Sequence, residues 1–342
     1  MDAQRPRFSL APLSSALFPS ASTSFLLAFR PISTLHAMPG RRSKKCPKAR
    51  FFALYILCPL ALWTSFWAYF PQHLRETIQL WAENERNRGH VVSFEPGHAS
   101  GWPFAVRIPL KNLHWQDGKG HQIDAPEASV SLHPWSWRTL NVLAANAGGQ
   151  WSGAAFAIRK ASVTVHTPLW PPKSHAEAGL TFSASLNGIE LKTPSLMPLG
   201  KTVESLSLSF RVMGPLPDPV NKKTLAAWNN KNGIVECDAF EAVWGPLTVA
   251  MKGTVALTGN LQPEGAFAGR IAGLEKALDA FAEATCIGKP EAALASSFLK
   301  QTAQTPAASD ESGLDTPITI QSGGLFIGPA RVLTLPPIDW PQ

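Results

Sequence analysis

The sequence predicts a mainly β protein with some α-helix: an N-terminal transmembrane helix, then an extended antiparallel sheet with one apolar face and a late helical pair packed on it. Three observations predict this class. Residues 51–70 form an uncharged apolar run. Several later segments alternate apolar and small polar residues with a period of two, which is typical of half-buried strands. Residues 274–299 then return to helical spacing.

The positive charge of the chain is concentrated in its first 50 residues. Of the 342 residues, 45% are hydrophobic and 16% charged, which supplies a core and argues against disorder of the whole chain. The formal charge is +7, but residues 1–50 hold nine basic residues and one acidic residue, which leaves 22 basic and 23 acidic residues for the remainder. A nucleic-acid surface on the folded part is therefore not expected.

The run from Phe51 to Phe70 has the length of a membrane span. As a helix it covers about 30 Å, the thickness of a bilayer's hydrocarbon core. A buried soluble helix is one alternative; a cleaved signal peptide is another, but this run ends in Phe66–Phe70 rather than in small residues. By the positive-inside rule, the basic residues before the run keep the N-terminus in the cytoplasm. These topology determinants are Arg41, Arg42, Lys44, Lys45, Lys48 and Arg50.

The expected location is therefore the inner membrane of a bacterium, crossed once, with the C-terminal domain in the periplasm. Met38 begins an ordinary anchor sequence, so the residues before it are interpreted as an over-long start annotation or a dispensable extension. The predicted segments are 1–37 (extension), 38–50 (basic cytoplasmic flank), 51–70 (transmembrane helix), 71–90 (stalk helix) and 91–342 (periplasmic β-rich domain), with a flexible loop at 301–316.

Strands are predicted where the period is two. The clearest cover 104–110, 206–212 and 247–257, and others are expected near 128–132, 162–166, 266–271 and 318–335. Asn187-Gly188 lies between two alternating segments and predicts a hairpin turn. Leu274–Phe281 predicts a late helix, and Pro290 is suited to begin a second one.

The segment Gly101-Trp102-Pro103-Phe104 is predicted to be a structural motif. Pro103 fixes its own φ angle and restricts Trp102, and Gly101 tolerates backbone angles that other residues avoid. Together they are expected to set how the chain enters its first long strand. The alternation from Phe104 onward predicts that its side chain lies in the core.

These residues also carry a family resemblance. The segment 101–104 soon after the anchor, the paired strands in the middle, and Gly323–Gly328 leading to Leu335-Pro336-Pro337 resemble an uncharacterised alphaproteobacterial envelope family, domain of unknown function 2125. The resemblance covers roughly residues 71–340 and implies no catalytic residues. In layout alone, the chain is similar to the AsmA-like proteins, which implies an anchor followed by a long periplasmic sheet that cradles lipid.

The chemistry-bearing residues predict no catalytic, cofactor or metal site. Cys237 and Cys286 lie on the oxidising side of the predicted membrane, where a disulfide and two unpaired thiols remain equal alternatives. The histidines lack metal-ligand spacing. His114, His121 and His133 are expected to lie at the surface or to have separate hydrogen-bond partners rather than to share a metal ion. The sequence also contains no nucleophile elbow and no phosphate-binding loop.

Twelve tryptophans are a high count for this length. Five of them lie in the first half of the predicted domain, where ordinary packing is favoured over an apolar groove for acyl chains. They are Trp115, Trp135, Trp137, Trp151 and Trp170.

The function expected from these patterns is that of a non-enzymatic, membrane-anchored periplasmic protein that binds a lipid or other hydrophobic ligand in envelope biogenesis, without a cofactor. An envelope scaffold that works through protein partners is the alternative, and a hydrolase is a weaker one. A ligand binder needs an uncovered part of the apolar face, whereas a scaffold needs that face closed.

Overall fold

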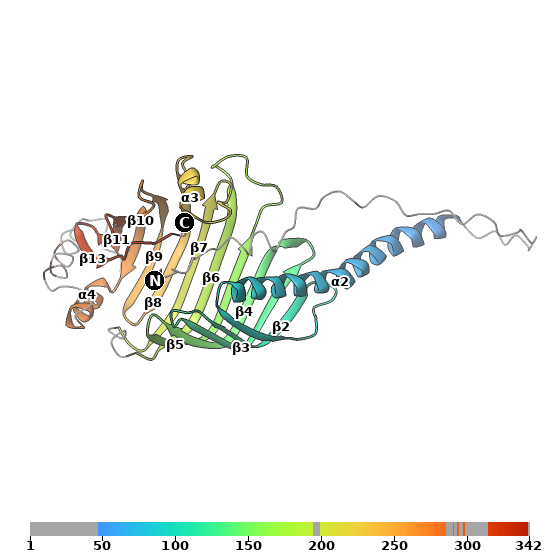
Figure 1. Cartoon of the computed structure of the whole chain (residues 1–342), viewed down its shortest axis with the longest axis horizontal. Coiled ribbons are helices and arrows are strands. Elements are labelled where there is room, and N and C mark those ends of the chain that lie inside the picture. The colour runs from blue at the N-terminus through green and yellow to red at the C-terminus, as the bar shows by residue number, and fades with distance from the viewer. Residues whose placement is uncertain are drawn as a thin grey trace, which may run out of the picture.

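The computed structural model describes residues 47–193, 199–284 and 314–340, together with residues 290, 293 and 297. Its main feature is one sheet of thirteen strands, in which each strand pairs antiparallel with its neighbours in the chain (Figure 1). The sheet is therefore a simple meander. The predicted long antiparallel sheet is confirmed.

The described helices and strands follow in chain order. They are α2 (Pro47–Asn87), β1 (Val91–Pro96), β2 (Val106–Gln116), β3 (Gln122–His133), β4 (Ser136–Trp151), β5 (Ala154–His166), β6 (Ala178–Leu191), β7 (Thr202–Met213), α3 (Lys222–Asn229), β8 (Val235–Trp244), β9 (Leu247–Leu257), β10 (Pro263–Ala272), α4 (Leu274–Glu283), β11 (Leu314–Gln321), β12 (Gly324–Ile327) and β13 (Ala330–Thr334).

The two faces of the sheet differ sharply in polarity. Successive strands align apolar residues in one row across β4 to β12, and the positions beside this row align polar or small residues on the other face. This confirms the predicted single apolar face. The apolar row is Leu140, Val165, Phe182, Phe210, Cys237, Gly253, Phe267, Ile318 and Ile327. The neighbouring row is Asn141, Thr164, Ser183, Ser209 and Ala239.

Two separate clusters bury parts of the apolar face. At one end α2 lies across β2, β3 and β4 (Figure 1), where Leu74 and Ile78 pack against Val106, Ile108 and Val130. At the other end α4 packs through Leu274 and Leu278 against the β8–β11 region. The first helix of the predicted late pair is thus confirmed, whereas most of the second lies outside the described residues.

The predicted membrane helix and stalk form one continuous helix rather than two. Helix α2 runs through Pro59 and Pro71 and ends at Asn87, close to the predicted end of the stalk helix at residue 90. Its N-terminal part projects beyond the sheet (Figure 1). Within the described part of the chain, no helix is both long enough and apolar enough for a membrane span. The transmembrane assignment of residues 51–70 therefore stays a prediction.

Three other predictions need correction or lie beyond the described residues. Asn187 and Gly188 do not form a hairpin turn but lie inside β6, because this stretch pairs with β5 on one side and with β7 on the other. The predicted loop 301–316 is too long, since Leu314 and Thr316 already pair with β10. The extension 1–37, residues 38–46 of the basic flank and most of the predicted loop lie outside the described residues.

The motif Gly101–Phe104 forms a turn before β2 instead of the start of that strand. Gly101 has φ +101°, and its carbonyl accepts a hydrogen bond of 2.8 Å from the amide of Ala105. A Cβ at Gly101 would lie 2.7 Å from the Ala105 carbonyl oxygen, so the turn requires glycine. Because the alternation begins only at Val106, the Phe104 side chain is 67% exposed, and its predicted place in the core is wrong.

Candidate functional site

The apolar face forms a partly open cavity between the regions covered by α2 and α4. Its volume is about 230 Å³. The walls come from the ends of β5 to β9, from the β7–β8 connection that contains α3, and from the C-terminal segment. The lining residues are Val165, Thr167, Leu180, Phe182, Val212, Leu216, Pro217, Val220, Leu225, Trp228, Val235, Val255, Ala256, Leu257 and Trp340.

Helix α3 forms the roof of this cavity, and its start is fixed by local sequence. The side chain of Asn221 accepts a hydrogen bond of 2.9 Å from the Thr224 amide, and the Thr224 hydroxyl accepts one of 3.1 Å from the Asn221 amide, which forms a reciprocal capping box. Leu225 and Trp228, three residues apart, then point from the same side of the helix into the sheet and are buried. The roof is thus a preformed element.

Trp228 is held rigidly in the roof. Its indole Nε1 donates a hydrogen bond of 2.9 Å to the backbone carbonyl of Met213, so its buried polar atom is satisfied. The chain passes closely over the indole at Gly233, where a Cβ would lie 2.2 Å from the ring. The large apolar surface of Trp228 is therefore presented to the cavity in a fixed orientation.

The C-terminal segment closes a second side of the cavity. Trp340 donates through Nε1 to the carbonyl of Leu261 at 2.6 Å, and Ile338 exchanges two hydrogen bonds with the Gln262 side chain at 2.8 and 3.0 Å. These contacts hold the last described residues against the β9–β10 turn. The end of the chain is therefore part of the site.

The lining contains very little polar chemistry. Among the fifteen lining residues only Thr167 carries a polar group apart from the two indoles, and its hydroxyl has no hydrogen-bond partner among the described residues. Such a surface offers dispersion and hydrophobic contacts and one hydroxyl, and it provides no acid, base or nucleophile pair. The site suits retention of an apolar molecule.

The tryptophans singled out from the sequence are not the ones that build this cavity. None of the five lines it, and Trp228 and Trp340 take that place. Ordinary packing, the favoured interpretation, fits Trp115, which is half-buried and stacks on the Trp151 ring at 6.3 Å. It is wrong for the other four, Trp135, Trp137, Trp151 and Trp170, whose side chains are exposed. The sequence does contain a local pattern that indicates helix α3. It is the capping pattern from Asn221 to Thr224, followed by Leu225 and Trp228 at helical spacing.

Only one cysteine of the possible disulfide lies within the described residues. Cys237 is a buried free thiol in the cluster below α4, and Cys286 lies outside the described residues. Burial, aided by the nearby charge of Asp238, raises the pKa of the Cys237 thiol. The disulfide therefore stays a prediction.

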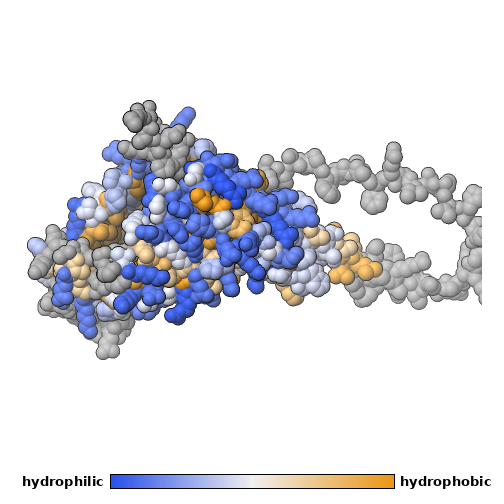
Figure 2. Space-filling view, turned by 60° about the horizontal axis from the view of Figure 1, so that its bottom comes forward, coloured by the Kyte–Doolittle hydropathy of each residue, from blue (hydrophilic) through white to orange (hydrophobic). Residues whose placement is uncertain are grey.

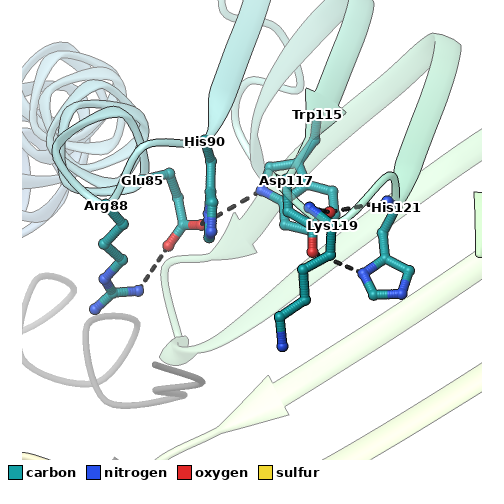
Figure 3. Close-up of polar contacts among 7 residues, drawn as sticks. All are labelled: Glu85, Arg88, His90, Trp115, Asp117, Lys119 and His121. Atoms are coloured by element: carbon teal, nitrogen blue, oxygen red, sulfur yellow. Dashed lines mark hydrogen bonds and ion pairs between the residues drawn. The ribbon is translucent and has the colours of Figure 1, made fainter. Parts of the chain in front are cut away.

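A polar cluster holds the end of α2 on the sheet, away from the cavity (Figure 3). The carboxylate of Glu85 is buried and lies 2.7 Å from both Arg88 and the His90 ring, and it accepts a longer bond of 3.3 Å from the Trp115 indole. A buried carboxylate needs such partners. The cluster is therefore a structural lock between the helix and β2.

The β2–β3 turn beside this lock carries a second acid–histidine pair (Figure 3). Asp117 lies 2.7 Å from the His121 ring, which stacks on Trp151 at 4.3 Å. Burial alone raises the pKa of Asp117, but hydrogen bonds from His121 and from the His121 and Lys119 amides outweigh it and lower that pKa overall.

The histidines considered as metal ligands are each satisfied separately. His114 pairs with Asp124 at 2.6 Å, His121 pairs with Asp117, and His133 lies 3.1 Å from the Phe104 carbonyl. Within the described ranges, no three His, Cys, Asp or Glu side chains are grouped to hold a metal ion.

Comparison with known proteins gives one match. The model of the family described as "Uncharacterized protein conserved in bacteria (DUF2125)" matches residues 67–149 and 141–336. The chain belongs to this family. The matched DUF2125 region includes all thirteen strands, α3 and every lining residue of the cavity except Trp340. No curated protein and no solved structure matches the chain. The predicted resemblance to this family is confirmed.

Proposed function

We propose that this DUF2125 protein is a non-enzymatic, membrane-anchored protein of the bacterial cell envelope that binds a lipid or another hydrophobic ligand in the cavity beneath α3. Its N-terminus would lie in the cytoplasm, its anchor in the inner membrane and its sheet in the periplasm. No cofactor is part of this proposal. The likeness in layout to the AsmA-like proteins and an alphaproteobacterial origin belong to the same proposal.

The cavity is the observation that carries the ligand proposal. Its volume of about 230 Å³ exceeds the roughly 150 Å³ of an engineered apolar cavity that binds benzene. Its lining is almost wholly apolar, so these side chains gain contacts when an apolar molecule enters. The size suits a segment of an acyl chain better than a whole lipid, whose headgroup would remain outside.

The incomplete covering of the sheet favours a ligand binder over a scaffold without a ligand. A scaffold was expected to have its apolar face closed by helices. Instead, α2 and α4 cover the two ends, and the region around Phe182 and Phe210, whose rings stack at 4.8 Å, borders the cavity.

The proposal of a membrane anchor rests on the sequence before the sheet and on the exposure of α2. Residues 51–70 carry no charge and follow the basic flank. Where α2 projects from the sheet, several of its apolar side chains are exposed, as the hydrophobic atoms on the projecting helix illustrate (Figure 2). They include Tyr55, Leu57, Leu60 and Leu62, each more than half exposed.

The anchor and its orientation are tested by reporter fusion. A reporter that is active only outside the cytoplasm, fused after Gln342, should be active. Activity of a cytoplasm-only reporter at the same position would overturn the orientation, and recovery of the full chain in the soluble fraction would overturn the anchor itself.

Ligand binding is tested by mass spectrometry of lipids that copurify with the detergent-extracted protein. Val255 lines the cavity, and its neighbour Thr254 is exposed on the opposite face of β9, so the pair gives a matched test. Val255→Trp should fill the cavity and reduce the bound lipid several-fold, and Thr254→Trp should leave it unchanged. Equal lipid content in both variants would contradict binding in this cavity.

A further inference from the structure

One end of the sheet carries a group of exposed apolar side chains that the cavity does not use. We call this group the aromatic collar. In an antiparallel meander, the β1–β2, β3–β4 and β5–β6 connections all lie at the same end of the sheet. The side chains of the collar belong to these three connections, and each is more than half exposed. They are Trp102, Phe104, Trp135, Leu169 and Trp170.

Helix α2 leaves the sheet beside the aromatic collar. The Trp63 ring stacks on the Trp135 ring with centroids 6.4 Å apart. One turn later, the Trp67 Nε1 donates to the Ala105 carbonyl at 3.2 Å, next to Phe104. The part of α2 before Trp63 extends past this end of the sheet (Figure 1), and its side chains at positions 55, 57, 60 and 62 are apolar and exposed. The collar and the projecting helix therefore form one continuous apolar surface.

The segments that hold the collar side chains carry no formal charge. Residues 97–105, 134–135 and 167–172 contain no Asp, Glu, Lys or Arg, although Lys173 and Glu177 follow in the rest of the β5–β6 connection. The β2–β3 turn at the other end of the sheet contains Asp117 and Lys119. Exposed aromatic residues without neighbouring charges are unusual on a water-facing surface. Tryptophan, with an apolar body and one N–H group, is the residue enriched where a membrane meets water.

We propose that the aromatic collar rests in the headgroup region of the same membrane that holds α2, so that this end of the sheet faces the bilayer. The inference rests on the proposed anchor and adds a second contact to it. A bilayer is favoured over a protein partner because the collar continues directly into the uncharged stretch 51–70. Thr167, which lines the cavity, lies two residues before Leu169, so the same connection joins the collar to the cavity wall.

The collar is tested on the full chain in phosphatidylcholine–phosphatidylglycerol vesicles. An environment-sensitive dye is attached to a single cysteine, either at Trp170→Cys in the collar or at Lys119→Cys at the opposite end, after replacement of the four native cysteines. At position 170 the dye should shift to the blue and be quenched by lipids that carry a nitroxide. At position 119 it should show neither effect.

The controls separate failure of the collar from failure of the anchor. If the protein floats with the vesicles but the dye at 170 behaves as in water, the collar proposal is wrong and the anchor stands. A blue shift without quenching by the labelled lipid would mean that protein, such as a second copy of the chain, covers the collar, which also overturns the proposal. Protein that does not float contradicts the anchor and the collar together.

Limited proteolysis of the unmodified protein gives an independent readout that needs no substitution. Lys173 is exposed directly after the β5–β6 part of the collar. Trypsin should cleave after Lys173 in detergent and much more slowly in vesicles, whereas cleavage after Lys119 should proceed at the same rate in both. Equal cleavage after Lys173 in detergent and in vesicles would contradict contact with the membrane.

Discussion

Trp115 donates its indole N–H to the buried carboxylate of Glu85 at 3.3 Å, and this bond joins the last turn of α2 to β2 across 30 positions of the sequence. The same carboxylate is paired with Arg88 and lies within hydrogen-bonding distance of the His90 ring. Because the lock fixes the helix on the sheet, it also fixes the direction in which the projecting part of α2 leaves the domain.

Removal of this lock should destabilise the sheet domain. Glu85→Ala leaves the partly buried Trp115 indole and its neighbours without their acceptor, and we expect a loss of roughly 1–3 kcal/mol in the free energy of unfolding. Glu83→Ala, at an exposed position on the same helix, is the matched control and should change stability by less than about 0.5 kcal/mol. Denaturant unfolding in detergent measures both, and equal stabilities would rule out the lock.

In the turn at Gly101–Phe104, substitution of Gly101 should destabilise the protein, whereas substitution of Phe104 should have little effect on stability. Gly101→Val forces a β-branched residue to φ +101° and against the Ala105 carbonyl, so we expect a loss of about 1–3 kcal/mol. Phe104→Ala removes an exposed ring and should change stability by less than about 0.5 kcal/mol. Thermal melting compares the stabilities of the two variants. A large loss of stability in Phe104→Ala would contradict the exposed position of the Phe104 side chain.

Asp117 should make stability depend on acid pH. Its pKa is lower in the folded protein than in the unfolded chain, so its ionised form contributes stability at neutral pH. This contribution is lost as the pH falls below the ordinary aspartate pKa and through the lowered one. Asp117→Asn should therefore lower stability at pH 7 and flatten the dependence between pH 5 and 3. An unchanged slope in pH-dependent unfolding would contradict the role of this pair.

The Cys237 thiol should be nearly unreactive in the folded protein. Burial raises its pKa, so little thiolate is present at neutral pH, and the side chain is shielded from reagents. Iodoacetamide should label it only after unfolding. If the predicted disulfide to Cys286 exists, neither cysteine will be labelled in unfolded, unreduced protein; labelling of both would exclude that bridge.

Periodic patterns predicted the sheet well because each strand has one apolar and one polar face. The alternation at 206–212 and 247–257 corresponds to β7 and β9. The same rule failed at Phe104, where a turn that depends on Gly101 interrupts the strand. It also failed at Asn187-Gly188, whose turn chemistry is overridden by pairing with strands on both sides.

The cavity was beyond prediction because its walls come from segments far apart in the chain. Thr167, Trp228 and Trp340 meet only after the meander has brought β5, the β7–β8 connection and the C-terminal segment to the same end of the sheet. Their individual signals were weak, and no periodic pattern connects them. The capping box at Asn221 was the one local feature that indicated a helix at this place.

Photo-crosslinking tests the central claim, that the cavity holds an apolar chain, most directly. The detergent-solubilised protein is incubated with a fatty acid that carries a diazirine near the end of its chain, irradiated and digested for mass spectrometry. We predict crosslinks on cavity residues such as Leu225 and Val255, and their loss in Val255→Trp but not in Thr254→Trp. Crosslinks confined to the polar face around Ser183 and Ser209, or equal labelling of both variants, would contradict the account.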